Sequence, residues 1–471
     1  MNRLPHTPQL VDGPVGKTLV RLTLPMSVGI LGMVAFNLVD TFFVGRLGTL
    51  ELAAMSFTFP VVLVVGSIAR GLGVGTTAVI SRAIGEGDHQ KVQRMTTDSL
   101  LLSLLVVIAF VVVGLLTIEP LFRLLGAGDE ILPLIRRYML IWYAGMPFVV
   151  IPMVGNSAIR ATGDTKTPSM IMLAAMLVNL GLDPLLIFGP GPFPRLELAG
   201  AALATAIARA SALGVSLYVL RKREGMITLS LPRLRELAYT WRRVLYLGVP
   251  AAATYIVIPL STGIVTRLVA GYGVDRVAGF GVASRIELFA LTLVRALSVV
   301  LIPFVGQNLG AGKFERIQIG LRGAQVFSLL WGFFLFAIFL FLGRPIAAIF
   351  NKDSQVVATT ALYLSIVSLS YGCQGILELN ASTFNALNRP MPAAGLSIMR
   401  TLVLYIPLAL LGSRLFALKG IFAAAAVANI VTAGVSSIQL WSVIKGLLPM
   451  STSGEETDPV SQRGVATAKK T

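Results

Sequence analysis

The chain has 471 residues, of which 55% are hydrophobic and only 13% are charged. A soluble domain carries about 25% charged residues, so this composition indicates an integral membrane protein. The formal net charge of +17 comes from lysines and arginines in short segments between apolar runs, which is typical of membrane loops and predicts no nucleic-acid partner.

Apolar runs recur along the whole chain, and each is long enough to cross a bilayer as a helix, which takes about 20 residues. The runs lack the period-two alternation of a β-barrel. We predict an all-α polytopic membrane protein with twelve transmembrane helices. The spans are expected near residues 17–46, 52–80, 95–117, 133–159, 167–189, 198–220, 241–271, 277–306, 318–342, 358–386, 391–413 and 418–446.

A basic, polar interruption at 221–240 divides the spans six and six. We therefore expect an N-lobe at 17–220, a C-lobe at 241–446 and a cytoplasmic linker between them. Residues 1–16 form a cytoplasmic N-terminal segment, and the polar residues 447–471 a disordered cytoplasmic tail. Both termini are placed inside because the linker carries many arginines and each lobe has an even number of spans.

The two halves of the sequence repeat each other at a constant shift of 225 residues. Residues that coincide are Pro25 with Pro250, Arg70 with Arg295, Gly85 with Gly310 and Gly87 with Gly312. Because six spans keep the orientation, the two halves form a parallel repeat. The repeat predicts two pseudo-symmetric six-helix bundles that face each other across a substrate cleft.

Features shared by both halves indicate packing or a common motion, whereas features of one half indicate chemistry. Pro25 lies in the first span and is either a static kink or a hinge that bends during transport. The shared Arg70 and Arg295 indicate an ion pair or a contact with a backbone carbonyl. Glu287 and Glu378 are candidate partners for them.

Two intramembrane acids, Asp40 in 36-FNLVDTFFVGRLG-48 and Asp183 in 178-VNLGLDPLLIFG-189, have no acidic counterpart in the second half. Each lies six residues from the outer end of its span, about 9 Å below it, so both are expected in one chamber. Intramembrane acids mark ion pathways, and the alternative is a structural hydrogen bond to a neighbouring helix.

Polar neighbours support an ion site. Asn179 lies one turn before Asp183 on the same helix face, and Pro184 frees the Leu180 carbonyl. Thr205 of the sixth span is a further candidate, although a small residue there also suits helix packing. These oxygens are suitable ligands for protons or for Na+ at Asp40, Asn179 and Asp183, and no organic cofactor is expected.

Soft side chains in the first lobe are candidates for a substrate pocket, although methionine is also an ordinary membrane-core residue. The pocket candidates are Met26, Met33, Asn37, Met153, Met172 and Met176. The two histidines, His6 and His89, lie outside any catalytic cluster, so we expect no enzyme.

The motifs 25-PMSVGILGMVAFNLVDTFFVGRLG-48, 156-NSAIRATGDTKTP-168, 179-NLGLD-183 and 305-VGQNLGAGKFER-316 resemble those of the multidrug and toxic compound extrusion (MATE) family. The resemblance covers residues 15–446. It implies the MATE fold of two six-helix lobes, and antiport of organic, often cationic, compounds against H+ or Na+.

Within that family, Asp40, Asn179 and Asp183 match the ion-site positions of the DinF-like or archaeal-like branch. Thr205 matches more loosely, and Pro25 matches the proline at which the first helix bends. Another branch uses acids in the seventh and tenth helices. Its seventh-helix position falls at about Ile258, and Glu378 lies only near the tenth-helix position.

We therefore expect a monomeric multidrug efflux antiporter in the plasma (inner) membrane of a prokaryote, acting on small organic substrates. The alternative is a lipid-linked precursor flippase of the same superfamily. Such a protein carries a wide cationic cavity and often extra spans, whereas here the basic residues lie mostly in loops.

Overall fold

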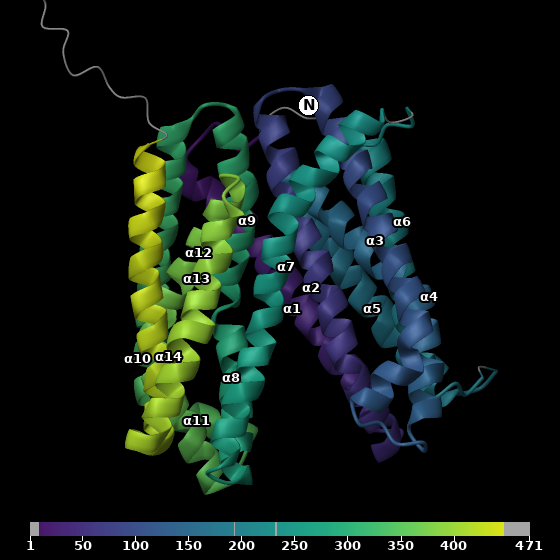
Figure 1. Cartoon of the computed structure of the whole chain (residues 1–471), viewed down its shortest axis with the longest axis vertical. Helices are drawn as coiled ribbons and strands as arrows, with labels where there is room; N and C mark the ends of the chain where they lie inside the picture. The colour runs from purple at the N-terminus through teal and green to yellow at the C-terminus, as the bar shows by residue number, and fades with distance from the viewer. Residues whose placement is uncertain (1–8, 193, 231–232, 447–471) are drawn as a thin grey trace, which may run out of the picture.

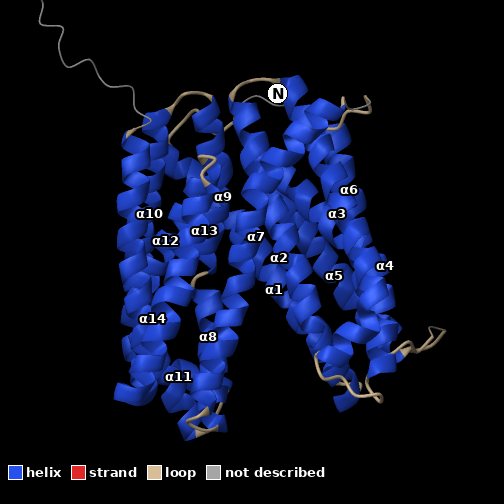
Figure 2. Ribbon diagram, in the orientation of Figure 1, coloured by secondary structure: helices blue, strands red, loops and turns tan. Residues whose placement is uncertain are grey.

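The structure is a computed structural model that describes residues 9–192, 194–230 and 233–446, apart from four side chains (Asn37, Leu38, Thr49 and Leu52). The described residues form helices and loops and no strand (Figure 2). Apolar segments become helices in hydrocarbon because a helix satisfies its own backbone hydrogen bonds. The predicted disordered tail at 447–471 lies outside the described residues.

The first half of the chain forms one bundle of six long helices. They are α1 (Val15–Gly45), α2 (Thr49–Gly85), α3 (His89–Leu124), α4 (Leu132–Ala161), α5 (Lys166–Phe188) and α6 (Leu198–Tyr218), which η1 (Val219–Arg223) extends as a π-helix. Pro25 lies inside α1, and the helix continues through it.

The second half forms a second bundle, in which three of the spans are interrupted. Its elements are α7 (Leu234–Ala270), α8 (Val274–Ala290), α9 (Thr292–Gly310), α10 (Phe314–Phe350), α11 (Ser354–Val367), η2 (Ser368–Ser370), α12 (Tyr371–Ala386), α13 (Pro390–Ile398), η3 (Met399–Tyr405) and α14 (Ile406–Lys445). Only Leu291 separates α8 from α9, so these two helices form one span.

The described residues contain 11 segments that are long and apolar enough to cross a membrane, and the last runs over 56 residues from Pro390 to Lys445. Ala417 interrupts that last segment with φ 52° and ψ −137°, so it supplies two spans. The total is the predicted twelve. The predicted linker at 221–240 is helical at both of its ends, because η1 reaches Arg223 and α7 begins at Leu234.

The repeat is visible in the last hairpin of each bundle. Glu197 precedes α6 with φ 54° and ψ −129°, nearly the same backbone conformation as Ala417. Three residues later, a Cβ on Gly200 would lie 2.2 Å from the Leu186 carbonyl oxygen, and one on Gly420 2.0 Å from that of Gly412. The shift between the halves is therefore 220 residues here, rather than 225.

The two bundles lie close together at the end where the chain begins and diverge toward the other end (Figure 1). At the close end, a Cβ on Gly85 would lie 2.2 Å from the Gln307 carbonyl oxygen, and one on Gly310 would lie 2.3 Å from that of Arg82. The repeated glycines thus permit the helix ends of the two lobes to touch. Gly87 and Gly312, with φ +76° and +70°, form the turns that follow.

The residues before α1 fasten this close end. The fully buried Leu10 donates its backbone N–H to Gln307 Oε1 at 3.1 Å. The same Gln307 side chain donates to the Ala161 carbonyl of the first lobe at 2.7 Å. Asp12 and Lys313 form an ion pair at 2.8 Å. One glutamine of the second lobe therefore holds both the N-terminal segment and α4.

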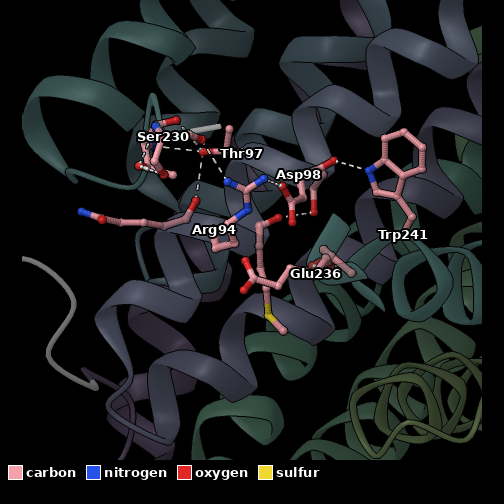
Figure 3. A network of polar contacts seen from close by, with 11 residues as sticks. Arg94, Thr97, Asp98, Ser230, Glu236 and Trp241 are labelled. Carbon is pink, nitrogen blue, oxygen red and sulfur yellow. Dashed lines mark hydrogen bonds and ion pairs between the residues drawn. The ribbon is translucent and has the colours of Figure 1, made fainter. Parts of the chain in front are cut away.

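The segment that joins the lobes is bound to α3 (Figure 3). Arg94 donates to the Ser230 carbonyl at 3.0 Å, and Thr97 Oγ1 accepts from the Thr228 backbone N–H at 3.1 Å. Trp241 of α7 donates its indole N–H to the Asp98 carbonyl at 2.9 Å. The buried Asp98 carboxylate pairs at 2.7 Å with Arg94 of the same helix, the arginine that contacts Ser230.

Candidate ion and substrate sites

The predicted polar residues of α5 and α6 meet in the first bundle. Asn179 and Asp183 are fully buried on one face of α5. The Asn179 amide donates to Asp183 Oδ1 at 3.0 Å and to Thr205 Oγ1 of α6 at 3.5 Å. The i,i+4 spacing and the facing helix therefore produce the predicted constellation.

Asp40 of α1 completes the group. Its side chain is half-buried, and it lies close enough to Asp183 for the two carboxylates to interact electrostatically. The structure thus brings into one site two acids that are 143 positions apart in the chain. Two ionised carboxylates that lie close together repel each other, so a bound cation or proton would stabilise the site.

Two residues of this site escaped the sequence analysis. Tyr138 of α4 is buried close to both Asp40 and Asp183, and Arg209 of α6 interacts electrostatically with Asp40. Arg209 also stacks over Phe36, one turn before Asp40, at 4.5 Å from the ring centroid. An arginine inside an apolar span was a sufficient signal, because such residues are rare there.

The site offers oxygens with free lone pairs. Asp40 Oδ1, Asn179 Oδ1 and Asp183 Oδ2 are buried and accept no hydrogen bond from the described residues. Carboxylate and amide oxygens suit a proton or Na+. The described part of the chain contains no group of three His, Cys, Asp or Glu residues that could hold a metal ion, so a multidentate carboxylate centre is not formed there.

The predicted methionine pocket does not appear as one feature. Met26 is buried in a hydrophobic core that spans both lobes, and Met153 packs against a separate core of the first lobe. Met33, Met172 and Met176 are half-buried, and the Asn37 side chain lies outside the described residues. A cavity of about 490 Å³ between α5 and α6 is lined by none of the predicted pocket residues.

The second lobe has its own polar centre, around Glu287 of α8. Tyr363 donates to Glu287 Oε2 at 2.5 Å, and Gln374 donates to Oε1 at 3.1 Å. Asn429 in turn donates to Gln374 at 3.4 Å and to Ser370 at 2.9 Å. Both oxygens of Glu287 are therefore bonded, whereas Asp40 and Asp183 each keep one buried oxygen without a hydrogen bond from any described residue. The partners of Glu287 are these side chains, whereas the repeat had suggested it as a candidate partner for Arg70 or Arg295.

The repeated arginines have different surroundings in the two lobes. Arg295 forms an ion pair with Glu378 at 3.6 Å. Arg70 contacts the Gly66 carbonyl at 3.1 Å and stacks over Tyr255 of α7 at 5.2 Å from the ring centroid. The ion pair and the carbonyl contact that the repeat suggested thus occur, one in each lobe.

Two six-helix bundles with buried carboxylates in one of them define a polytopic membrane transporter. The MatE family profile matches residues 25–185 and 250–411, once in each half, and the two matches begin 225 positions apart at the repeated prolines. The chain belongs to the MATE family, whose members are transporters rather than enzymes.

Relatives of different kinds share this fold. An FAD transporter of Shewanella oneidensis is 39% identical over 421 residues, which are 89% of this chain and 93% of that protein. The multidrug export protein MepA of Staphylococcus saprophyticus is 26% identical over 409 residues, 86% of this chain and 89% of its own length. The Vibrio cholerae MATE transporter VcmN in the bent form has 31% identity and a TM-score of 0.86, over 92% of this chain and 98% of VcmN.

Proposed function

We propose that this MATE transporter is a secondary antiporter that exports organic compounds in exchange for H+ or Na+. The observation that carries the proposal is the buried group of Asp40, Asn179, Asp183 and Thr205 in the first lobe. This arrangement is that of the DinF-like or archaeal-like branch, to which we assign the chain.

The coupling step is neutralisation of the two carboxylates. Two acids that interact electrostatically and keep unbonded oxygens favour binding of a cation from the side of higher concentration. Arg209 lies beside Asp40 and limits the net negative charge of the site. Uptake of one H+ or Na+ then removes the repulsion and allows the helices that carry the acids to move closer.

Pro25 is the proposed hinge of that movement. A proline inside a helix leaves the carbonyl four residues earlier without its backbone donor, which lowers the resistance to bending at that point. Pro25 and Asp40 lie on the same helix, α1, so a change at the acid is transmitted along it. The similarity to VcmN, which was solved in a bent form, agrees with a transporter that changes its shape.

The orientation follows from charge. The basic linker lies at the end where the lobes touch, and we place this end and both termini in the cytoplasm of a prokaryotic cell. The diverging ends then face outward, across the plasma (inner) membrane. We propose that the monomer is the transporting unit, because a single chain contains both lobes and a complete ion site.

Two substrate classes have support. Organic cations suit the acids of the first lobe and agree with the multidrug exporters among the relatives. Flavin dinucleotide is the second candidate, supported by the 39% identity to an FAD transporter over 89% of this chain. None of the relatives described above is a lipid-linked precursor flippase, so that alternative has no support from them.

Transport in reconstituted vesicles tests the proposal. Uptake of ethidium and of FAD would be measured under an H+ gradient and, separately, under a Na+ gradient. Asp40→Asn and Asp183→Asn should each reduce gradient-driven flux at least about tenfold, because the coupling between two sites typically changes affinity by about 5- to 150-fold. Asp129→Asn is the control, because that exposed acid pairs only with Arg123 among the described residues. Full gradient-driven flux in both site variants would refute the coupling role.

A further inference from the structure

Arg70 lies where the two lobes begin to diverge. Helices α2 and α7 cross in close contact: a Cβ on Gly71 would lie 2.4 Å from the Gly248 carbonyl oxygen, and 2.7 Å from Ala252 Cβ. Helix α2 runs toward the close end and α7 runs away from it (Figure 1). Arg70 comes just before Gly71, and Tyr255 one turn after Ala252. Both side chains therefore lie on the open side of the crossing.

A second arginine reaches the same place from α4. Arg160 donates to Ser157 Oγ at 2.6 Å, and the same Ser157 Oγ would lie 2.6 Å from a Cβ on Gly73 of α2. Arg160 also interacts electrostatically with Tyr255. The phenol ring of Tyr255 thus has a guanidinium on its face and a second one nearby.

The charges at this place do not balance. Glu378 is the acid that interacts with Tyr255, and it is paired with Arg295. Neither Arg70 nor Arg160 takes part in an ion pair with any described residue. Three arginines and one glutamate leave a net charge of +2. By the repeat, Arg70 is the counterpart of Arg295, so only the copy in the second lobe is neutralised.

Arginines within membrane spans are rare and mark substrate or ion pathways, and an arginine without an acidic partner is available to pair with an anion. The planar guanidinium presents several donors that match phosphate oxygens, more so than it suits an organic cation. We propose that Arg70 and Arg160, with Tyr255 between the lobes, form a binding site for the phosphate groups of an anionic substrate such as a flavin dinucleotide. This inference rests on the second substrate candidate above.

The site also has the right position for a transported anion. Its residues come from α2 and α4 of one lobe and α7 of the other, so a bound phosphate bridges the lobes at the point about which they separate. A rearrangement of the lobes changes the distance between Arg70 and Tyr255. The affinity for the anion therefore depends on the conformation, as alternating access requires.

Binding to the purified full-length protein in detergent tests the site with two probes, FAD and riboflavin, which lacks phosphate. Arg70→Gln and Arg160→Gln should each weaken FAD binding about tenfold or more, and change riboflavin binding less than about twofold. Arg322→Gln is the matched control, since Arg322 also stacks on an aromatic ring, that of Trp441 at 4.9 Å. Arg70→Lys should retain part of the affinity, and inorganic pyrophosphate should displace FAD but not riboflavin.

The inference is wrong if the wild type binds riboflavin as tightly as FAD, or if the two Gln variants weaken both ligands equally. Where a variant unfolds, the salt dependence of wild-type binding replaces it: added salt must weaken FAD binding and leave riboflavin binding unchanged. Gradient-driven efflux of ethidium without phosphate-dependent flavin binding would leave the antiporter proposal intact and remove this site. Phosphate-dependent FAD binding without gradient-driven flux would do the reverse.

Discussion

The contact between Gly85 and Gln307 predicts how a single methyl group changes the balance of conformations. In Gly85→Ala, the new Cβ would lie 2.2 Å from the Gln307 carbonyl oxygen, whereas ordinary contact begins at 3.4 Å. The helix ends of the two lobes must therefore move apart by the difference, 1.2 Å. Overpacking of this kind costs about 1–3 kcal/mol, which corresponds to roughly a 5- to 150-fold shift in an equilibrium constant.

Spin labels can measure the shift. Gln90 and Glu315 are exposed, are equivalent by the repeat, and lie just beyond the turns that follow Gly85 and Gly310. Both would be changed to Cys in a Cys373→Ala background and labelled for distance measurement by electron resonance. Gly85→Ala should increase the population with long distances, because only the close packing is destabilised.

Gly323→Ala is the control, because a Cβ on that helical glycine meets no atom within 4 Å. The same distance distribution in Gly85→Ala, Gly323→Ala and the unmutated background would refute the argument. It would show that the close end accommodates the added methyl group by a local change, without separation of the lobes.

Three further predictions concern stability and the close end. Gln307→Ala removes the bonds to Leu10 and Ala161, and should accelerate hydrogen exchange at Leu10 by at least about tenfold, since each buried bond contributes about 1 kcal/mol. Ala417→Gly should raise the melting temperature, because φ 52° with ψ −137° strains a non-glycine residue by about 1–3 kcal/mol. Burial of Asp164 favours its neutral form, but hydrogen bonds from Thr167 and Arg223 outweigh burial and lower the pKa of Asp164. Its contribution is therefore complete above the unfolded-state pKa of about 3.9 and is lost as pH falls through the lower folded value, so Asp164→Asn should lower the melting temperature at pH 7 and not at pH 2.

Much of the fold could be predicted because the membrane imposes it. Uninterrupted apolar runs must be helical, and the repeat specifies how six of them relate to the other six. The interruptions within spans were not predictable. Leu291 between α8 and α9 and the 3₁₀ segment before α12 carry no proline or glycine signal of their own. They reflect packing against other helices, which a single sequence does not display.

The part of the candidate site that could be predicted in detail consists of residues close together in the sequence. Asn179 and Asp183 share a helix face, and their hydrogen bond follows from that spacing. Partners on other helices were predicted less well. Glu287 is bonded by Tyr363 and Gln374, 76 and 87 positions away, whereas the sequence had suggested Arg70 or Arg295 as its partner. Arg209 carried a detectable signal, because an arginine within an apolar span is rare.

The two charged sites have a consequence for coupling. A cationic substrate competes with H+ or Na+ for the same carboxylates, and such competition alone is enough to exchange one for the other. A phosphate held by Arg70 and Arg160 does not compete with a cation at Asp40, because opposite charges attract. For an anionic substrate, exchange therefore requires that the ion and the phosphate favour different arrangements of the lobes. The ion site lies wholly within the first lobe, whereas the arginine site includes Tyr255 of the second. We therefore propose that bending of α1 and separation of the lobes at the α2–α7 crossing are the movements that link the two sites.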